Sequence, residues 1–156
     1  MTRYKHTQIG YLMIATTLIV LALFTWIQNT ARAEPSSIDS GANFFITFIM
    51  IITLSLLVSL VSLTTSIDEK YLRIKFGWGT FRKKFLLSEI VSVRRVKNYW
   101  YFGWGIRFQL WPRMWVYNVS GFDAVEIIMT NGKIYRIGTD VPDELEVAIE
   151  QALIKK

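Results

Sequence analysis

The sequence predicts two N-terminal transmembrane α-helices followed by a small α+β, mainly β, domain. Three observations predict this fold class: two uncharged apolar runs, an alternating apolar–polar pattern after them, and one apolar helical stripe near the C-terminus. The apolar runs cover residues 9–28 and 44–63, and neither contains Asp, Glu, Lys or Arg. About 20 helical residues, each rising about 1.5 Å, cross the ~30 Å hydrocarbon core of a bilayer. We therefore expect a transmembrane hairpin within residues 1–67 and a separate domain over residues 68–156.

Basic residues beside the apolar runs predict the orientation. Two Lys or Arg residues precede the first run, the connecting loop has only Arg32, and six lie between residues 70 and 84. Lys and Arg in short flanking segments are retained in the cytoplasm, so both termini are expected there. The alternative is a signal peptide cleaved after Ala33, because Ala31-Arg32-Ala33 fits a cleavage site. In either case the tail is expected to be cytoplasmic.

The net charge of +6 is unevenly distributed. Residues 68–113 contain 11 Lys or Arg and 3 Asp or Glu, whereas residues 114–156 contain 4 and 7. A basic part next to the membrane favours an anionic lipid surface as its neighbour. The chain has no cysteine, and its only histidine, His6, precedes the first run. The tail thus lacks the commonest general base, metal ligand and reactive thiol, and we expect a non-enzymatic protein without cofactor or metal.

Period-two alternation predicts about seven antiparallel strands after the second run. The expected strands cover residues 71–76, 80–86, 90–96, 106–111, 115–119, 124–129 and 134–138. Asn131-Gly132 between the last two predicts a hairpin turn, because both residues tolerate positive φ. A stripe with helical spacing then predicts a C-terminal helix that begins near Pro142; its members are Leu145, Ala148, Ile149, Ala152 and Leu153.

Six segments of the tail carry a resemblance to a known family: Gly103–Arg107, Trp115–Gly121, Val125–Ile127, Asn131–Lys133, Tyr135–Asp140 and Pro142–Leu145. With these segments, the tail resembles the bacterial pleckstrin-homology-like (PH-like) domains, which often follow paired membrane spans. The resemblance implies a partly open β-barrel capped by the C-terminal helix, and it implies no catalytic residues. It also implies a multi-pass protein of the bacterial inner (cytoplasmic) membrane.

Basic residues around the first expected hairpin form one candidate site: Lys75, Arg82, Lys83 and Lys84. Pleckstrin-homology domains that bind phosphoinositides hold head groups with basic residues in similar positions. The turn itself, Gly77-Trp78-Gly79, carries no charge. These four residues are expected to face the membrane, either to orient the domain on acidic lipid or to bind a specific anionic lipid.

Aromatic residues form the second candidate site. Nine of them lie between residues 99 and 117, and Trp and Tyr favour surfaces that are apolar on one side and wet on the other. We expect Phe108 in the core and Trp100, Tyr101 and Phe102 on an exposed docking loop. Nucleic acid is not an expected partner of a chain with two spans. Asp123 and Glu126, the nearest approach to a carboxylate pair, are expected to face solvent.

The leading hypothesis is a non-enzymatic, membrane-anchored PH-like domain that acts as a binding or scaffolding module at the cytoplasmic face of the membrane. Its expected partners are the anionic inner leaflet and a protein, either a different chain or a second copy of this one. The alternative function is a sensor or binder of anionic lipid through the basic first hairpin.

Overall fold

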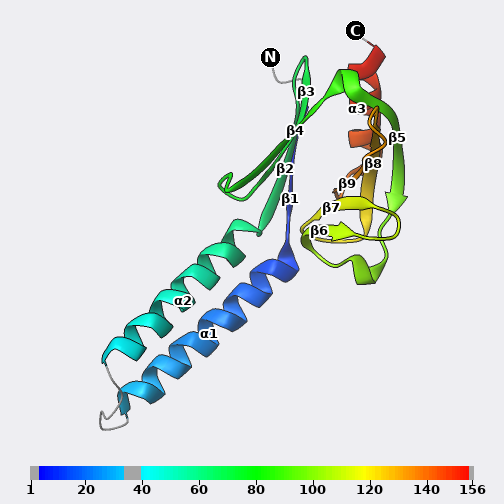
Figure 1. Ribbon diagram of the computed structural model, residues 1–156. Helices are drawn as coiled ribbons and strands as arrows, with labels where there is room; N and C mark the ends of the chain where they lie inside the picture. Colours follow the sequence, from blue (N-terminus) through cyan, green and yellow to red (C-terminus); the bar gives the residue numbers. More distant parts are fainter. Residues whose placement is uncertain (1–3, 34–39, 155–156) are drawn as a thin grey trace.

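The computed structural model describes residues 4–33 and 40–154, and the nine strands in this part form two sheets (Figure 1). A strand precedes the two long helices, and the remaining strands and a third helix follow them. In chain order the elements are β1 (Tyr4–Ile9), α1 (Tyr11–Ala33), α2 (Ser40–Ser59), β2 (Ser62–Ile67), β3 (Tyr71–Phe76), β4 (Phe81–Leu86), η1 (Leu87–Glu89), β5 (Ile90–Lys97), η2 (Trp100–Phe102), β6 (Gly105–Gln109), β7 (Met114–Asn118), β8 (Asp123–Met129), β9 (Ile134–Gly138) and α3 (Pro142–Ile154). Sheet A has the strand order β1-β2-β3-β4 and sheet B the order β5-β8-β9-β7-β6. The protein is therefore α+β.

Strands β1 and β2 were not expected from the sequence. They pair antiparallel from Tyr4↔Ile67 to Ile9↔Ser62, and β2 also pairs with β3. Sheet A therefore includes two strands from within residues 1–67. Both faces of β1 are largely polar, so the strand carries no alternating hydrophobic signal, although it follows the usual alternation of inward and outward side chains. The two helices do not have the bounds of the expected spans, because Ile9 lies in β1 and Ser62 lies in β2.

The seven expected strands are all present, with bounds that differ by at most two residues. Their pairing is not wholly antiparallel as expected, because β7 and β9 are parallel. Strand β9 returns from β8 through the Asn131-Gly132 turn and inserts between β8 and β7. The alternation of apolar and polar residues along a strand indicates which side chains are buried. It does not indicate which other strand is its neighbour in the sheet or whether the two are parallel.

The main core lies between the two sheets and is covered at one end by α3. Alternate residues of β3, Leu72, Ile74 and Phe76, are at most 1% exposed and face side chains of β7, β8 and β9. Helix α3 contributes Leu145 and Ile149, which are fully buried. The expected C-terminal helix and its apolar stripe are thus confirmed, and burial of that stripe holds α3 against both sheets.

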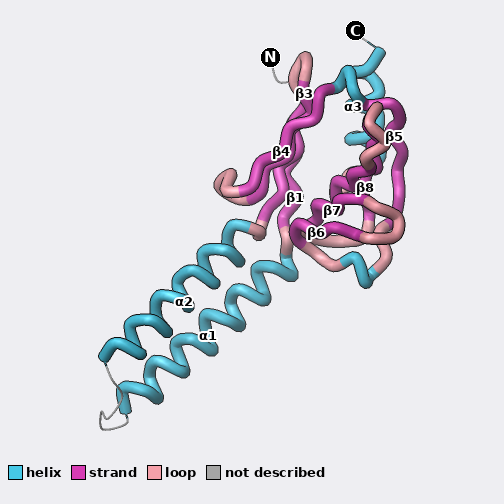
Figure 2. Tube along the Cα trace, viewed as in Figure 1, coloured by secondary structure: helices cyan, strands magenta, loops and turns pink. Residues whose placement is uncertain are grey.

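Helices α1 and α2 extend away from the sheets as a pair (Figure 2). Eight large hydrophobic side chains on α1 and eight on α2 are exposed. Within the described residues, Tyr11–Ala31 is the only helical stretch both long and apolar enough to cross a membrane, and the apolar stretch Phe44–Ser59 of α2 is shorter. By length and composition, α1 suits either a membrane span or a signal sequence.

Gly77, in the β3–β4 turn, brings that turn against the end of α2. A Cβ atom on Gly77 would lie 2.5 Å from the carbonyl oxygen of Ser59, and the Gly77 φ is +46°. Gly132 also has a positive φ, +75°, but open space around it. Its backbone N–H donates to the carbonyl of Met129 at 2.9 Å within the β8–β9 turn.

Because only Gly77 is in close contact with another part of the chain, we predict that Gly77→Ala destabilises the chain more than Gly132→Ala. Both substitutions carry the left-handed backbone penalty of about 1–2 kcal/mol, but only Gly77→Ala also forces the turn away from α2. Thermal unfolding of the full chain in detergent should show a melting temperature about 5 °C lower for Gly77→Ala than for Gly132→Ala. Equal melting temperatures would show that the turn does not depend on contact with α2.

Candidate binding surfaces

Strand alternation separates the four basic residues around the first hairpin. Lys75 pairs with Arg82 in the register, and both belong to the outward face of sheet A, opposite the buried Ile74 and Phe76. Lys84 is on the same outward face, across from Arg73. Lys83 instead pairs with Ile74 and lies on the inward side, with its Nζ 5.8 Å from the ring centroid of Tyr135. The hairpin therefore has basic groups on both of its faces.

The outward face of sheet A is more basic than the sequence indicated. The register places Lys5 of β1 across from Ser66 of β2, and Ser66 across from Arg73 of β3. Lys5 therefore joins the face that carries Lys75, Arg82 and Lys84. This residue was missed because β1 itself was not expected.

Most of these cations have no acidic partner. Arg73 bonds Asp68 at 2.7 Å, but within residues 4–33 and 40–154 no carboxylate forms an ion pair with Lys75, Arg82, Lys83 or Lys84. Arg82 Nε donates to the backbone carbonyl of Gly79 at 2.9 Å. The charges of Lys75, Arg82, Lys83 and Lys84 are thus not neutralised by an ion pair with any carboxylate in the described residues.

The β3–β4 turn places an exposed tryptophan beside the end of α2. Trp78 is 76% exposed, and its neighbour Gly77 donates its N–H to the carbonyl of Ser62 at 2.8 Å. Tyr11, the first residue of α1, is also exposed. Two amphipathic aromatic side chains therefore lie where the helical pair meets sheet A.

The aromatic loop is only partly exposed. Trp100 and Tyr101 are 77% and 57% exposed, as expected, but Phe102 is buried at 2%. The expectation that Phe102 lies on the exposed loop is therefore wrong. Phe102 packs with Met114 and Val116 in a second cluster on the outer face of sheet B, so it fixes the loop while its neighbours stay outside. Tyr99 and Tyr101 stack at 5.2 Å between ring centroids.

Glu126 does not face solvent, contrary to the sequence-based expectation. It is 1% exposed and accepts hydrogen bonds from Arg94 Nε at 2.7 Å and from Arg136 Nε at 2.8 Å. Arg136 also lies over the ring of Phe102, with its Cζ 5.5 Å from the centroid, and bonds Asn98. A buried charge needs such partners, and here the cluster connects three strands of sheet B to the aromatic loop.

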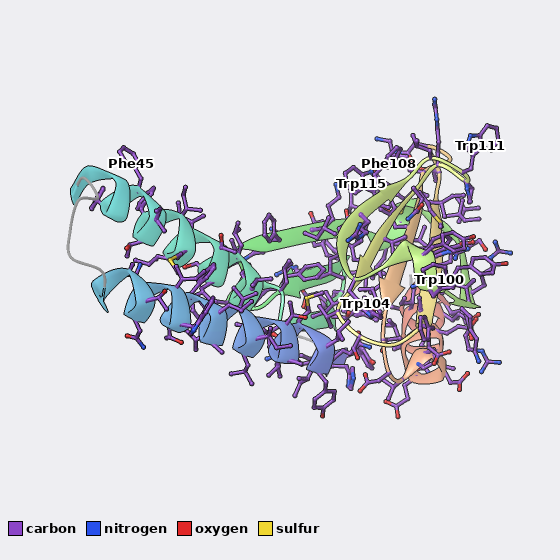
Figure 3. All side chains as sticks on the ribbon, turned by 90° about the horizontal axis from the view of Figure 1, so that it is seen from below. Phe45, Trp100, Trp104, Phe108, Trp111 and Trp115 are labelled. Atoms are coloured by element: carbon purple, nitrogen blue, oxygen red, sulfur yellow. The ribbon has the colours of Figure 1, made fainter. Side chains whose placement is uncertain are left out.

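Phe108 is 47% exposed, so the expectation that it lies in the core is also wrong. It pairs with Trp115 across β6 and β7, with ring centroids 5.2 Å apart. Trp111, 91% exposed, lies in the turn between these strands. Figure 3 shows Phe108, Trp111 and Trp115 at one end of this hairpin, away from Trp100 and Trp104. The aromatic residues therefore form two exposed groups instead of one.

The described part of the chain contains no group of three His, Cys, Asp or Glu side chains that could hold a metal ion. His6 Nε2 lies 2.6 Å from Asp140 Oδ1, so the histidine links β1 to the segment before α3. This contact joins the residues before α1 to the C-terminal part of the domain.

No family model, no curated protein and no solved structure matches this chain. The resemblance to PH-like domains therefore stays a prediction from the sequence.

The Glu126 cluster predicts a large effect of removing one buried charge. Glu126→Gln leaves Arg136, with a side chain only 12% exposed, without its anionic partner, and we expect a loss of about 3–5 kcal/mol in the free energy of unfolding. Asp143→Asn breaks the exposed Arg95–Asp143 pair and should cost about 1 kcal/mol or less. Chemical denaturation of both variants measures the difference. A loss for Glu126→Gln no larger than that for Asp143→Asn would contradict the proposed role of the cluster.

Proposed function

We propose that this protein is a non-enzymatic binding or scaffolding module, anchored by α1 and α2 in the bacterial inner membrane with both termini in the cytoplasm. The observation that carries the proposal is the register between β1 and β2. Ile9 and Ser62 pair with each other at the ends of β1 and β2 that are nearest the helices. Ile9 lies two residues before α1, and Ser62 lies three residues after α2. The two helices must therefore leave the sheet side by side, which is the geometry of a transmembrane hairpin.

The surface of the helical pair supports insertion of both helices. α1 has 23 residues and α2 has 20, so at about 1.5 Å per residue each helix is about as long as the ~30 Å bilayer core is thick. The apolar stretch of α2, Phe44–Ser59, covers most but not all of that length. Gln28 Nε2 of α1 donates to Thr47 Oγ1 of α2 at 3.0 Å, and such bonds join helices in lipid. The outward apolar side chains would otherwise contact water.

Retention of α1 is supported by the contacts of β1. Cleavage after Ala33 would remove the whole of β1, including Gln8, which is 3% exposed and donates to the carbonyl of Ser120 at 2.9 Å. It would also remove the contact between His6 and Asp140. Loss of an edge strand with these contacts argues against the signal-peptide alternative.

The aromatic loop is the proposed docking surface for a protein partner. Trp100, Tyr101 and Tyr99 are exposed together, and Phe102 and Arg136 hold the loop in one position. Exposed aromatic side chains with little freedom lose little entropy on binding, and they are enriched at the centres of protein interfaces. Such a module would need no catalytic residue.

A second candidate function is the binding of anionic lipid through the first hairpin. It is favoured by the cations of this hairpin that have no acidic partner in the described residues and by the contact of its turn with the end of α2. Each basic residue close to an anionic leaflet contributes about 1 kcal/mol to attraction.

The membrane topology can be tested with single-cysteine variants, because the chain contains no cysteine. We expect Ser37→Cys, between the two helices, to react with a membrane-impermeant maleimide in intact spheroplasts. Val91→Cys, 65% exposed on β5, should react only after the membrane is opened. Reaction of both variants in intact spheroplasts, or of neither, would contradict the hairpin topology.

The docking surface can be tested with a photoreactive amino acid at position 100. In native membranes we expect a discrete protein adduct at this position, and the same probe at Val91, which is also exposed (65%), serves as the control. Tyr101→Ala, which removes the ring that stacks on Tyr99, should lower the adduct yield several-fold. An adduct that also forms from position 91, or that is unchanged by Tyr101→Ala, would contradict docking through this loop.

A further inference from the structure

A small cleft opens between the first hairpin and the second sheet. Its volume is about 160 Å³, and its apolar lining includes Phe76 of β3, Ile106 of β6 and Tyr117 of β7. Phe76 and Tyr117 are 1% and 7% exposed, with ring centroids 6.3 Å apart. The cleft is therefore a gap at the edge of the main core, where β4 and β6 are not paired with each other.

Two basic residues of β4 line this apolar gap. Arg82 and Lys83 both line it, and Lys83 is the basic residue of the hairpin on the inward side of β4. Neither forms an ion pair with any carboxylate in the described residues. Burial raises the pKa of Tyr117 to about 12, and the neighbouring Tyr135 adds to this effect. Tyr117 therefore stays neutral at physiological pH and places no negative charge in the cleft.

The cleft lies near the end of α2, because both of its walls begin at glycines close to that end. Gly77, next to Phe76, approaches the carbonyl of Ser59, and a Cβ on Gly105, next to Ile106, would lie 3.9 Å from Leu60. Both walls of the cleft therefore begin beside the residues at which α2 ends. If α2 crosses the bilayer, the cleft opens at the level of the lipid head groups.

We propose that this cleft binds an anionic membrane phospholipid from the side, with its phosphate at Lys83 and the first part of one acyl chain against Phe76 and Tyr117. This inference rests on the proposed membrane insertion and deepens the second candidate function. Pockets for drug-sized ligands measure about 300–1,000 Å³, so a cleft of about 160 Å³ holds only part of a lipid. The remaining acyl chain stays in the bilayer.

The proposal is tested with the full chain in lipid nanodiscs. The probe is phosphatidylglycerol with a photoreactive group near the glycerol end of one acyl chain, and phosphatidylcholine with the same group is the comparison. We expect the phosphatidylglycerol probe to label peptides that contain residues 74–83 or residue 106 in preference to the phosphatidylcholine probe. Lys83→Gln should lower this labelling about tenfold, the effect of losing one charge-assisted hydrogen bond.

Lys84→Gln is the matched control, since it removes the same charge from the adjacent, outward-facing position of β4. Labelling should fall much less in Lys84→Gln than in Lys83→Gln, and it should be largely retained in Lys83→Arg. Equal losses in Lys83→Gln and Lys84→Gln would overturn the proposal in favour of a general surface attraction. Equal labelling by both probes would overturn the preference for an anionic lipid.

Two further outcomes separate this proposal from the proposed function. A chain that enters nanodiscs but shows no label at the cleft overturns the lipid site alone. A chain that does not enter nanodiscs overturns the membrane anchor and the lipid site together. Soluble glycerol phosphate in excess should not reduce the labelling, and if it does, a soluble phosphate ester is the ligand and the membrane lipid is not.

Discussion

The arrangement of this molecule depends on the hydrogen-bonded pairing of β1 with β2 at the ends of α1 and α2. Six consecutive residue pairs, from Tyr4↔Ile67 to Ile9↔Ser62, fix the spacing and direction of the two helices where they leave sheet A. Because β2 also pairs with β3, the position of the helices is transmitted to the β3–β4 hairpin. The contact of Gly77 with Ser59 completes this connection. The helical pair is thus joined to the sheet by backbone bonds, and a flexible linker is not needed.

This connection gives the basic and aromatic groups their proposed roles. Charges near a membrane act over about 10 Å at ordinary salt concentrations, so their effect depends on how the domain is held. If the helical pair is the proposed membrane anchor, the domain joined to it keeps the first hairpin beside the lipid surface and the aromatic loop at a fixed position on sheet B. In this arrangement, lipid contact and protein docking use separate surfaces, and one does not exclude the other.

Much of the fold could be predicted from the sequence, because burial imposes regular patterns. The strand of Leu72, Ile74 and Phe76 and the stripe of α3 both place apolar side chains at the spacing of their element. β1 could not be found in this way, since its inward side chains include His6 and Gln8, which are held by polar contacts. Within the candidate sites, alternation in a strand could have separated Lys83 from Lys84. In contrast, the burial of Phe102 and Glu126 depends on how the loop folds over the outer face of sheet B, and local sequence carries no signal for it.

The position of β1 also has a consequence for the order of assembly. The apolar helical pair lies in the chain between two strands that are immediate neighbours in sheet A. During synthesis the first strand leaves the ribosome before α1, but its partner follows only after α2 is complete. Sheet A therefore cannot close until both helices are made and have come together. For this protein, folding of sheet A and association of the helical pair are therefore one event, and a chain whose helices fail to associate leaves β2 with an unpaired edge.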